Sequence, residues 1–418
     1  MVVNGQNLPE FLRLATKIGY RPVMSTPPPV RRRSTRDLVL GAITEIGSAT
    51  RADVCRATAL SRSAVSECVG GLLREGLITE SKTELPGATR GRRATVLSVR
   101  SARGVVVGVD LGHAHITAAV ATSVGELIAE CSDQLDVDHF PARALDLAAT
   151  LARRALRRSG RRLGEVRAVA AGIPGPLDVR THVVSAPTIL SDWVGIDPAA
   201  ELTQRLGVPV VVGNDADMGA LGERAYGAAQ GVDDFLYVKA SHGIGAGIVL
   251  AGRTYRGATG IAGEIGHTQI PGATQWCRCG SRGCLETVVS ISNVRQQLTH
   301  VLSTNTAVLE EQDLAPLAEL AHNSSAARVI TDAGRTVGRV VADLVNCLNP
   351  AAIVLGGELG EAGEPFAAGV RESIDRYAQP ASATTVQVLP GRLGARAELL
   401  GTIATALRAP GVPGSVAG

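Results

Sequence analysis

From Gly104 onward the chain alternates short apolar segments with amphipathic ones, and this pattern constrains the fold most. The runs GVVVGVD, HITAAVA and VPVVVGN have the length and β-branched content of strands, whereas residues 142–158 and 325–348 have helical spacing. Such alternation is typical of α/β domains, in which polar side chains at the ends of strands line a central cleft. We therefore expect an α/β body over residues 104–408.

Residues 34–100 show a different pattern of three short helices followed by two short strands. Thr50 and Ser61 are suitable N-caps for the second and third helices. The loop between the strands, LPGATRGRR, is basic. This order predicts a winged helix-turn-helix over residues 34–100. The proline- and arginine-rich residues 1–33 predict a flexible arm, and residues 409–418 predict a tail.

Charge is distributed unevenly between these two parts. The first 104 residues carry 17 basic and 8 acidic side chains, and the remainder carries 25 and 31. A basic head on an acidic body favours DNA binding by the head. The alternative is a small helical interaction domain with a solvated basic loop. The residues expected at a DNA interface are Arg51, Arg62, Ser63, Ser66, Arg90, Arg92 and Arg93.

The overall composition excludes several classes of protein. Among the 418 residues, 45% are hydrophobic, which excludes a mainly disordered chain. No run of about 18 apolar residues occurs, so we expect no membrane span. The first residues lack the pattern of a cleavable export signal. Three of the seven cysteines lie within eight positions, which indicates a metal site rather than a disulfide framework. We therefore predict a cytoplasmic protein.

The segment HTQIPGATQWCRCGSRGCLE offers one imidazole and three thiolates, from His267, Cys277, Cys279 and Cys284. This ligand set suits tetrahedral zinc, and four protein ligands would close the coordination shell. We therefore predict a structural rather than a catalytic zinc. The alternative is a cluster of free thiols beside an unrelated histidine.

Several carboxylates surround this segment in the sequence. Glu264 lies in the glycine-rich run GATGIAGEIGH, Glu286 follows Cys284 by two residues, and Asn214 with Asp215 ends a predicted strand. Each carboxylate can accept two hydrogen bonds, which suits recognition of sugar hydroxyls. Taken singly, each of these residues could instead be a surface charge or a helix cap.

Together these motifs resemble the ROK family of repressors, open reading frames and sugar kinases. The motifs occur in the family's order over about residues 104–405: DLG at 110–112, GIPGPLD at 172–178, GNDAD at 213–217, GIGAGIVL at 243–250, GATGIAGEIGH at 257–267, CRCGSRGCLE at 277–286 and NPAAIVLGG at 349–357. With the winged helix, the chain resembles the family's regulator branch. The resemblance implies two actin-like (ribonuclease H-like) α/β lobes, assembled as a homodimer or homotetramer.

The resemblance also implies roles for individual residues. Asp215 matches the family's catalytic base, which activates a sugar hydroxyl toward ATP. His267 and the three cysteines would hold zinc. The residues implied to bind sugar are Asn214, Asp215, Glu264, His267 and Glu286.

Two departures from the kinases of the family concern the phosphate-binding loops. A D-x-G-G-T loop is replaced by Asp110-Leu111-Gly112-His113-Ala114-His115, and a G-T-G loop by Ser241-His242-Gly243. Bulky imidazoles should impede close approach of a triphosphate, so ATP is not expected as a cofactor. The degenerate nucleotide-loop positions are Asp110, Gly112, Ser241, His242, Gly243, Gly356 and Gly357.

We therefore predict a transcriptional regulator, most simply a repressor, that binds operator DNA and a sugar or sugar-phosphate effector. Two alternatives stay open. The first is an ATP-dependent sugar kinase with a fused DNA-binding domain, in which Asp215 is the base. The second is a metal-stapled interaction protein that uses neither DNA nor sugar. Because Asp215 is retained, residual kinase activity is compatible with the regulator.

Overall fold

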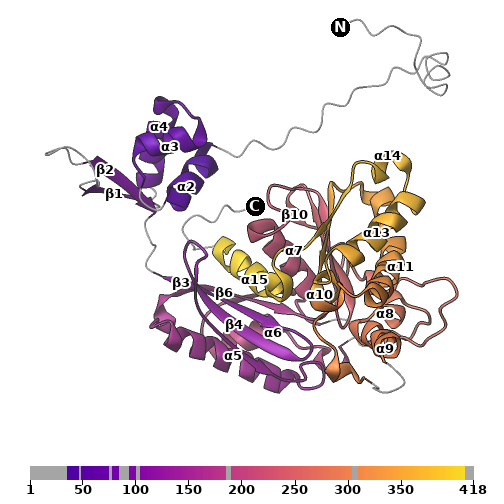
Figure 1. Cartoon of the computed structure of the whole chain (residues 1–418). Helices are drawn as coiled ribbons and strands as arrows, with labels where there is room; N and C mark the ends of the chain where they lie inside the picture. Colours follow the sequence, from indigo (N-terminus) through magenta and orange to yellow (C-terminus); the bar gives the residue numbers. More distant parts are fainter. Residues whose placement is uncertain are drawn as a thin grey trace, which may run out of the picture. The chain divides into compact units, whose positions relative to one another are not determined.

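The computed structural model describes residues 35–46, 49–74, 78–83, 94–99, 104–184, 190–303 and 309–409 (Figure 1). The chain divides into two compact units, Met1–Arg100 and Ser101–Gly418. Three predictions lie outside the described residues: the flexible arm over 1–33, the wing arginines Arg90, Arg92 and Arg93, and the tail from residue 410 onward. Within the described residues, no helix is both long and apolar enough to cross a membrane.

The described residues of the first unit form three helices and a hairpin. Its elements are α2 (Thr35–Ile46), α3 (Arg51–Thr58), α4 (Arg62–Arg74) and the antiparallel strands β1 (Ile78–Thr83) and β2 (Ala94–Val99). Thr50 caps α3 as the sequence predicts, because its hydroxyl accepts from the Asp53 amide at 3.2 Å and Asp53 reciprocates. Ser61 likewise accepts from the Ala64 amide at 3.3 Å. Val65 and Leu72 of α4 pack into the core of this unit.

The second unit begins with a five-stranded sheet in the order β5-β4-β3-β6-β7. Its strands are β3 (Val105–Leu111), β4 (His115–Thr122), β5 (Leu127–Gln134), β6 (Val166–Ile173) and β7 (Val210–Asn214). Strands β3, β6 and β7 are parallel, and β4 and β5 are antiparallel to their neighbours. Apolar residues of α5 (Pro141–Arg158) and α6 (Pro198–Leu206) cover one face. This sheet and these helices are called the first lobe.

A second five-stranded sheet has the order β10-β9-β8-β11-β12. Its strands are β8 (Phe235–Ala240), β9 (Ile244–Leu250), β10 (Arg253–Thr254), β11 (Ala352–Gly356) and β12 (Gln387–Pro390). The helices α9 (Ile291–Leu302), α11 (Ser324–Leu348) and α13 (Glu364–Tyr377) pack on one face. The second lobe also contains the short helices α8 (Leu285–Val288), α10 (Leu317–Leu320), α12 (Gly357–Gly360) and α14 (Pro380–Ala383).

Two helices, α7 (Asp215–Tyr226) and α15 (Ala397–Arg408), lie between the two sheets (Figure 1). Ile403 of α15 packs on the first sheet, whereas Ala220 of α7 and Ala397 of α15 pack on the second. The helices cross closely, because a Cβ on Gly401 would lie 1.7 Å from the Met218 carbonyl oxygen. The sequence analysis did not identify α7, which is short and rich in Gly, Ala and Asp.

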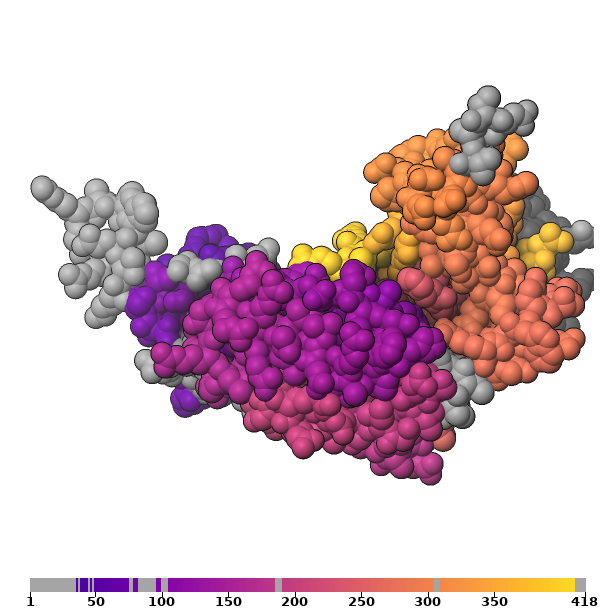
Figure 2. Space-filling view, turned by 90° about the horizontal axis from the view of Figure 1, so that it is seen from below, coloured from indigo at the N-terminus to yellow at the C-terminus, as the bar shows by residue number. Residues whose placement is uncertain are grey.

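This arrangement is the actin-like α/β fold that the resemblance to the ROK family implies. The carboxyl ends of β3, β7, β8 and β11 approach the space between the lobes. A notch is visible there in the space-filling view, between the magenta first lobe and the orange helices of the second (Figure 2). The polar residues that the sequence singles out line two cavities of the second unit, which are described below.

Candidate functional site

The five residues predicted to bind sugar surround one cavity of about 60 Å³. They come from three places: the β7–α7 junction, the loop after β10 and the start of α8. Asn214, Asp215, Glu264, His267 and Glu286 all contribute to its wall, together with Lys239 and Arg278. Residues up to 72 positions apart in sequence are thus brought into one small polar site.

The β7–α7 junction positions Asn214 and Asp215. Asn214 caps α7, because its Oδ1 accepts from the amides of Ala216 at 2.9 Å and Asp217 at 3.3 Å. Its Nδ2 donates to the Gly175 carbonyl at 3.3 Å. The capping role weighed in the sequence analysis is therefore real, and it also holds the GIPGP loop against the site.

The GEIGH segment places Glu264 and His267 beside β9. Gly263 has φ +98°, and a Cβ there would lie 2.0 Å from the Ala246 carbonyl oxygen, so only glycine fits this approach. Burial raises the pKa of Glu264 to about 7, aided by the negative charges of Asp215 and Glu286 and opposed by Arg278. Deprotonation of Glu264 therefore costs more free energy in the ligand-free protein than in water.

The predicted metal ligands converge beside this cavity. The ligand atoms of His267, Cys277, Cys279 and Cys284 all lie within 4.8 Å of one another, close enough to share one ion. The Nδ1 of His267 lies 3.5 Å from the Cys277 sulfur, while its Nε2 lies 3.7 Å from a Glu264 oxygen. The two nitrogens therefore face different sides, so that one can bind a metal while the other faces the cavity.

The donor set of this cluster fits a soft, tetrahedral cation such as zinc. Burial raises the pKa of the Cys277 thiol, and the Glu286 carboxylate adds to this effect. Burial likewise raises the pKa of Cys284. A bound cation offsets this cost because it coordinates the thiolate form.

The degenerate phosphate loops surround a second cavity of about 450 Å³. Asp110, Gly112, Ser241, His242 and Gly357 are in its wall, whereas Gly243 faces the smaller cavity and Gly356 packs against the Tyr237 ring. The imidazoles of His113 and His242 lie 5.9 Å apart.

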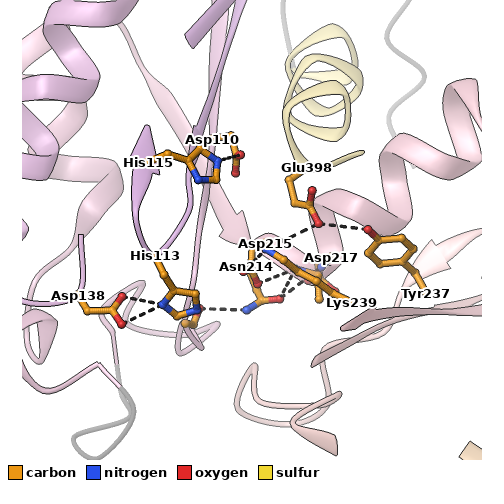
Figure 3. Close-up of polar contacts among 12 residues, drawn as sticks. Asp110, His113, His115, Asp138, Asn214, Asp215, Asp217, Tyr237, Lys239 and Glu398 are labelled. Carbon is orange, nitrogen blue, oxygen red and sulfur yellow. Dashed lines mark hydrogen bonds and ion pairs between the residues drawn. The ribbon is translucent and has the colours of Figure 1, made fainter. Parts of the chain in front are cut away.

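Two of these imidazoles are held by carboxylates. Nδ1 of His113 lies 2.8 Å from an Asp138 oxygen, and Nε2 of His115 lies 3.2 Å from Asp110 Oδ2 (Figure 3). Burial, and then the neighbouring His113, lower the pKa of His242 and so favour its neutral ring. The loops present aromatic rings where a phosphate would need small residues and backbone amides. The residues present do not fit a triphosphate.

The sequence analysis missed the cation at the junction of the two cavities. Nζ of Lys239, on β8, lies 2.7 Å from Asp215 Oδ2 and 3.7 Å from Glu398 Oε1 (Figure 3). Tyr237 donates to the same Glu398 oxygen at 3.1 Å. A signal was present, since one of only three lysines in the chain lies inside the apolar strand FLYVKA.

The candidate DNA-contacting residues of the first unit divide into three groups. Arg62, Ser63 and Ser66 are exposed on the first turns of α4. Arg51 forms an ion pair with Glu80 of β1, so its guanidinium already has a partner. The remaining three, on the wing, lie outside the described residues.

Comparison with known proteins decides the family. Residues 106–409 match the ROK family. The chain belongs to the ROK family. It is 28% identical over 378 residues to the xylose repressor of Caldicellulosiruptor bescii, covering 88% of this chain and 94% of that repressor.

Two solved structures of the ROK family differ in how much of this chain they match. A ROK transcriptional regulator described as a homolog of the Escherichia coli MLC protein matches 91% of this chain and 97% of its own, with TM-score 0.66 and 26% identity. A ROK glucokinase from Streptomyces griseus, solved with glucose and AMPPNP, matches with TM-score 0.62 and 27% identity. It covers 73% of this chain and all of its own. The regulator therefore matches far more of this chain than the kinase does.

Proposed function

We propose that this ROK protein is a DNA-binding transcriptional repressor of carbohydrate-related genes. In this proposal the first unit binds operator DNA and the second binds a sugar or sugar-phosphate effector in the cavity around Asp215 and Glu264. A homodimer or homotetramer would present two heads to two half-sites, and effector binding would change their spacing.

The observation that carries the proposal is the extent of similarity to regulators. A relative named as a xylose repressor and a solved ROK transcriptional regulator align with head and body alike. In the head, the exposed first turns of α4 suit contact with base edges, since Arg62 and the short polar Ser63 and Ser66 face solvent. The arginines at 90, 92 and 93 would neutralise phosphates.

In the body, the small polar cavity supports recognition of a sugar. Asp215, Glu264 and Glu286 offer acceptors for hydroxyl groups, and Arg278 offers donors. Zinc at His267, Cys277, Cys279 and Cys284 would hold the loop that carries Arg278. The metal is structural in this proposal, because four protein ligands leave no open position.

A sugar kinase with a fused head is the second candidate, and the intact Asp215 favours it. The geometry around Asp215 weighs against it. The carboxylate contacts the Lys239 ammonium through Oδ2 and the Ala216 amide through Oδ1 at 2.7 Å. To take a proton from a hydroxyl, it would have to give up this ion pair.

The experiment selects fragments of genomic DNA that the full-length protein retains and then measures binding by fluorescence anisotropy. A panel of pentoses, hexoses and their phosphates is added to the complex with the recovered fragment. We expect at least one compound to weaken DNA binding about tenfold or more. Arg62→Ala should weaken DNA binding without changing sugar affinity, whereas Arg392→Ala in the body is a control of equal charge.

Failure to enrich any sequence, or insensitivity of a specific complex to every compound, would contradict the proposal. Steady ATP-dependent phosphorylation of one of these sugars by the wild-type protein would favour the kinase instead.

A further inference from the structure

Lys239 is a largely buried lysine in contact with more than one carboxylate. Its side chain is 16% exposed, and its two ion-pair partners, Asp215 and Glu398, are 11% and 7% exposed. Burial alone would lower the pKa of this ammonium, but the charges of Asp215, Glu398 and Asp110 outweigh burial and the pKa is raised. Lys239 is therefore a permanent positive charge inside the body.

Asp110 completes the group of carboxylates around this charge. It shares the wall of the 450 Å³ cavity with Lys239 and Glu398. Its side chain is 5% exposed and its Oδ2 contacts His115. Its Oδ1 is buried without a hydrogen-bond partner among the described residues. A buried carboxylate oxygen without a partner is costly and indicates that a positive charge belongs nearby.

The three carboxylates come from three different elements of the fold. Asp110 is the last residue but one of β3, Asp215 begins α7 and Glu398 lies in the first turn of α15, while Lys239 projects from β8 (Figure 3). Oxygen ligands from separate elements around one point are what Mg²⁺ and Mn²⁺ bind in nucleotide-using enzymes. A glucokinase of this family was solved with AMPPNP. In this chain the Lys239 ammonium already contacts two of these carboxylates, Asp215 and Glu398.

We propose that Lys239 is the resident cation of the cleft and excludes a metal–nucleotide complex by occupying the carboxylates that would bind the metal. Two consequences follow. The cleft needs no divalent ion, so sugar binding by the wild type is the same with and without Mg²⁺. Removing the ammonium leaves three carboxylates facing one another and creates a site for a divalent cation. This inference does not depend on the proposed regulatory function.

The test titrates Mn²⁺ into the zinc-loaded, full-length protein, followed by calorimetry and by electron paramagnetic resonance of the free ion. The variants are Lys239→Ala, Lys239→Met and the charge-retaining control Lys239→Arg. We expect Lys239→Ala and Lys239→Met to bind Mn²⁺ at least about tenfold more tightly than the wild type or Lys239→Arg. Adding Asp110→Asn to Lys239→Ala should abolish the gain.

Stability gives a second measurement, because the carboxylates left by Lys239→Ala repel one another. Mn²⁺ should raise the melting temperature of Lys239→Ala and Lys239→Met but not that of the wild type. If a variant folds only when Mn²⁺ is present, that result supports the proposal. Two results would overturn it: variants that bind Mn²⁺ no better than the wild type, or a gain that survives Asp110→Asn. Failure to fold with or without Mn²⁺ would also count against it.

Discussion

The cysteine cluster and the Lys239 cleft both gather ionisable groups within the body, but they obtain positive charge differently. The cluster offers an imidazole and three sulfurs within 4.8 Å, and none of these four residues is a permanent cation. The cleft offers carboxylates, and an ammonium already lies 2.7 Å from one of them. The cysteine cluster can obtain positive charge only from a bound ion, whereas the cleft already contains the Lys239 ammonium.

The comparison shows two ways in which one fold can place positive charge beside a cluster of ionisable groups. In the proposed zinc site, the cation would hold several chain segments at once, which one lysine side chain cannot do. In the cleft, a single ammonium is enough to contact Asp215 and Glu398. On the proposed function, the body binds sugar without transferring phosphate, and such a body would have no use for the metal that a nucleotide brings.

The largest effect is expected from removing one ligand of the cluster. Wild-type protein should contain about one zinc per chain, and Cys279→Ser should lower metal affinity about a hundredfold or more because three ligands remain. Sugar affinity should fall with it, since His267 faces both sites. Metal analysis and sugar titration are the measurements, with the exposed Cys347→Ser as the matched control. Wild-type protein without zinc would contradict the assignment.

The next effect is a pH dependence that originates in the cleft. Burial, opposed by Lys239 and aided by Asp110 and Asp215, raises the pKa of Glu398 from 4.5 to about 7. Between these values the folded chain holds a proton that the unfolded chain has lost, so the free energy of unfolding falls as pH rises from about 4.5 to 7. The contribution of Glu398 to this change is on the order of 3 kcal/mol.

Glu398→Gln should therefore flatten the pH profile of stability across this window. Chemical denaturation at half-unit pH intervals measures the change, and the exposed Glu126→Gln controls for loss of one carboxylate. A profile that keeps its full slope in Glu398→Gln would show that Glu398 is ionised throughout. Such a result would also mean that Lys239 neutralises it completely.

Asp215 belongs to both the sugar cavity and the cleft, so its substitution tests how the two are joined. Asp215→Asn should weaken effector binding by about 1–3 kcal/mol, because an acceptor oxygen becomes a donor. DNA affinity without effector should stay near wild type. The control is Asp217→Asn, which removes a carboxylate that pairs with Arg256 outside the sugar cavity. Wild-type phosphorylation of a hexose that Asp215→Asn abolishes would reverse the assignment.

The sequence was sufficient for features encoded by local spacing. The predicted metal ligands, the glycine-rich loop before His267 and the Thr50 cap all depend on residues close together in the chain, and the structure brings each set together. The ring of charge around Lys239 could not be predicted in this way. Its members lie at 110, 215, 239 and 398, and only the packing of α7 and α15 between two sheets makes them neighbours.

The smallest effect is expected from Tyr237, a neutral residue that donates a hydrogen bond to Glu398. Tyr237→Phe removes the hydroxyl that donates to Glu398 at 3.1 Å, and the ring keeps its packing in the core of the second lobe. A buried hydrogen bond of this kind contributes about 1 kcal/mol, so unfolding should become easier by about that amount. Measuring Tyr237→Phe again in a Glu398→Gln background gives the coupling between the two side chains. If the tyrosine stabilises the charged carboxylate, its removal should cost more at pH 8 than at pH 5, because Glu398 is ionised only at the higher pH. An equal cost at both pH values would show that the Tyr237 hydroxyl bonds the protonated and the ionised carboxyl equally, and so does not respond to the charge of Glu398.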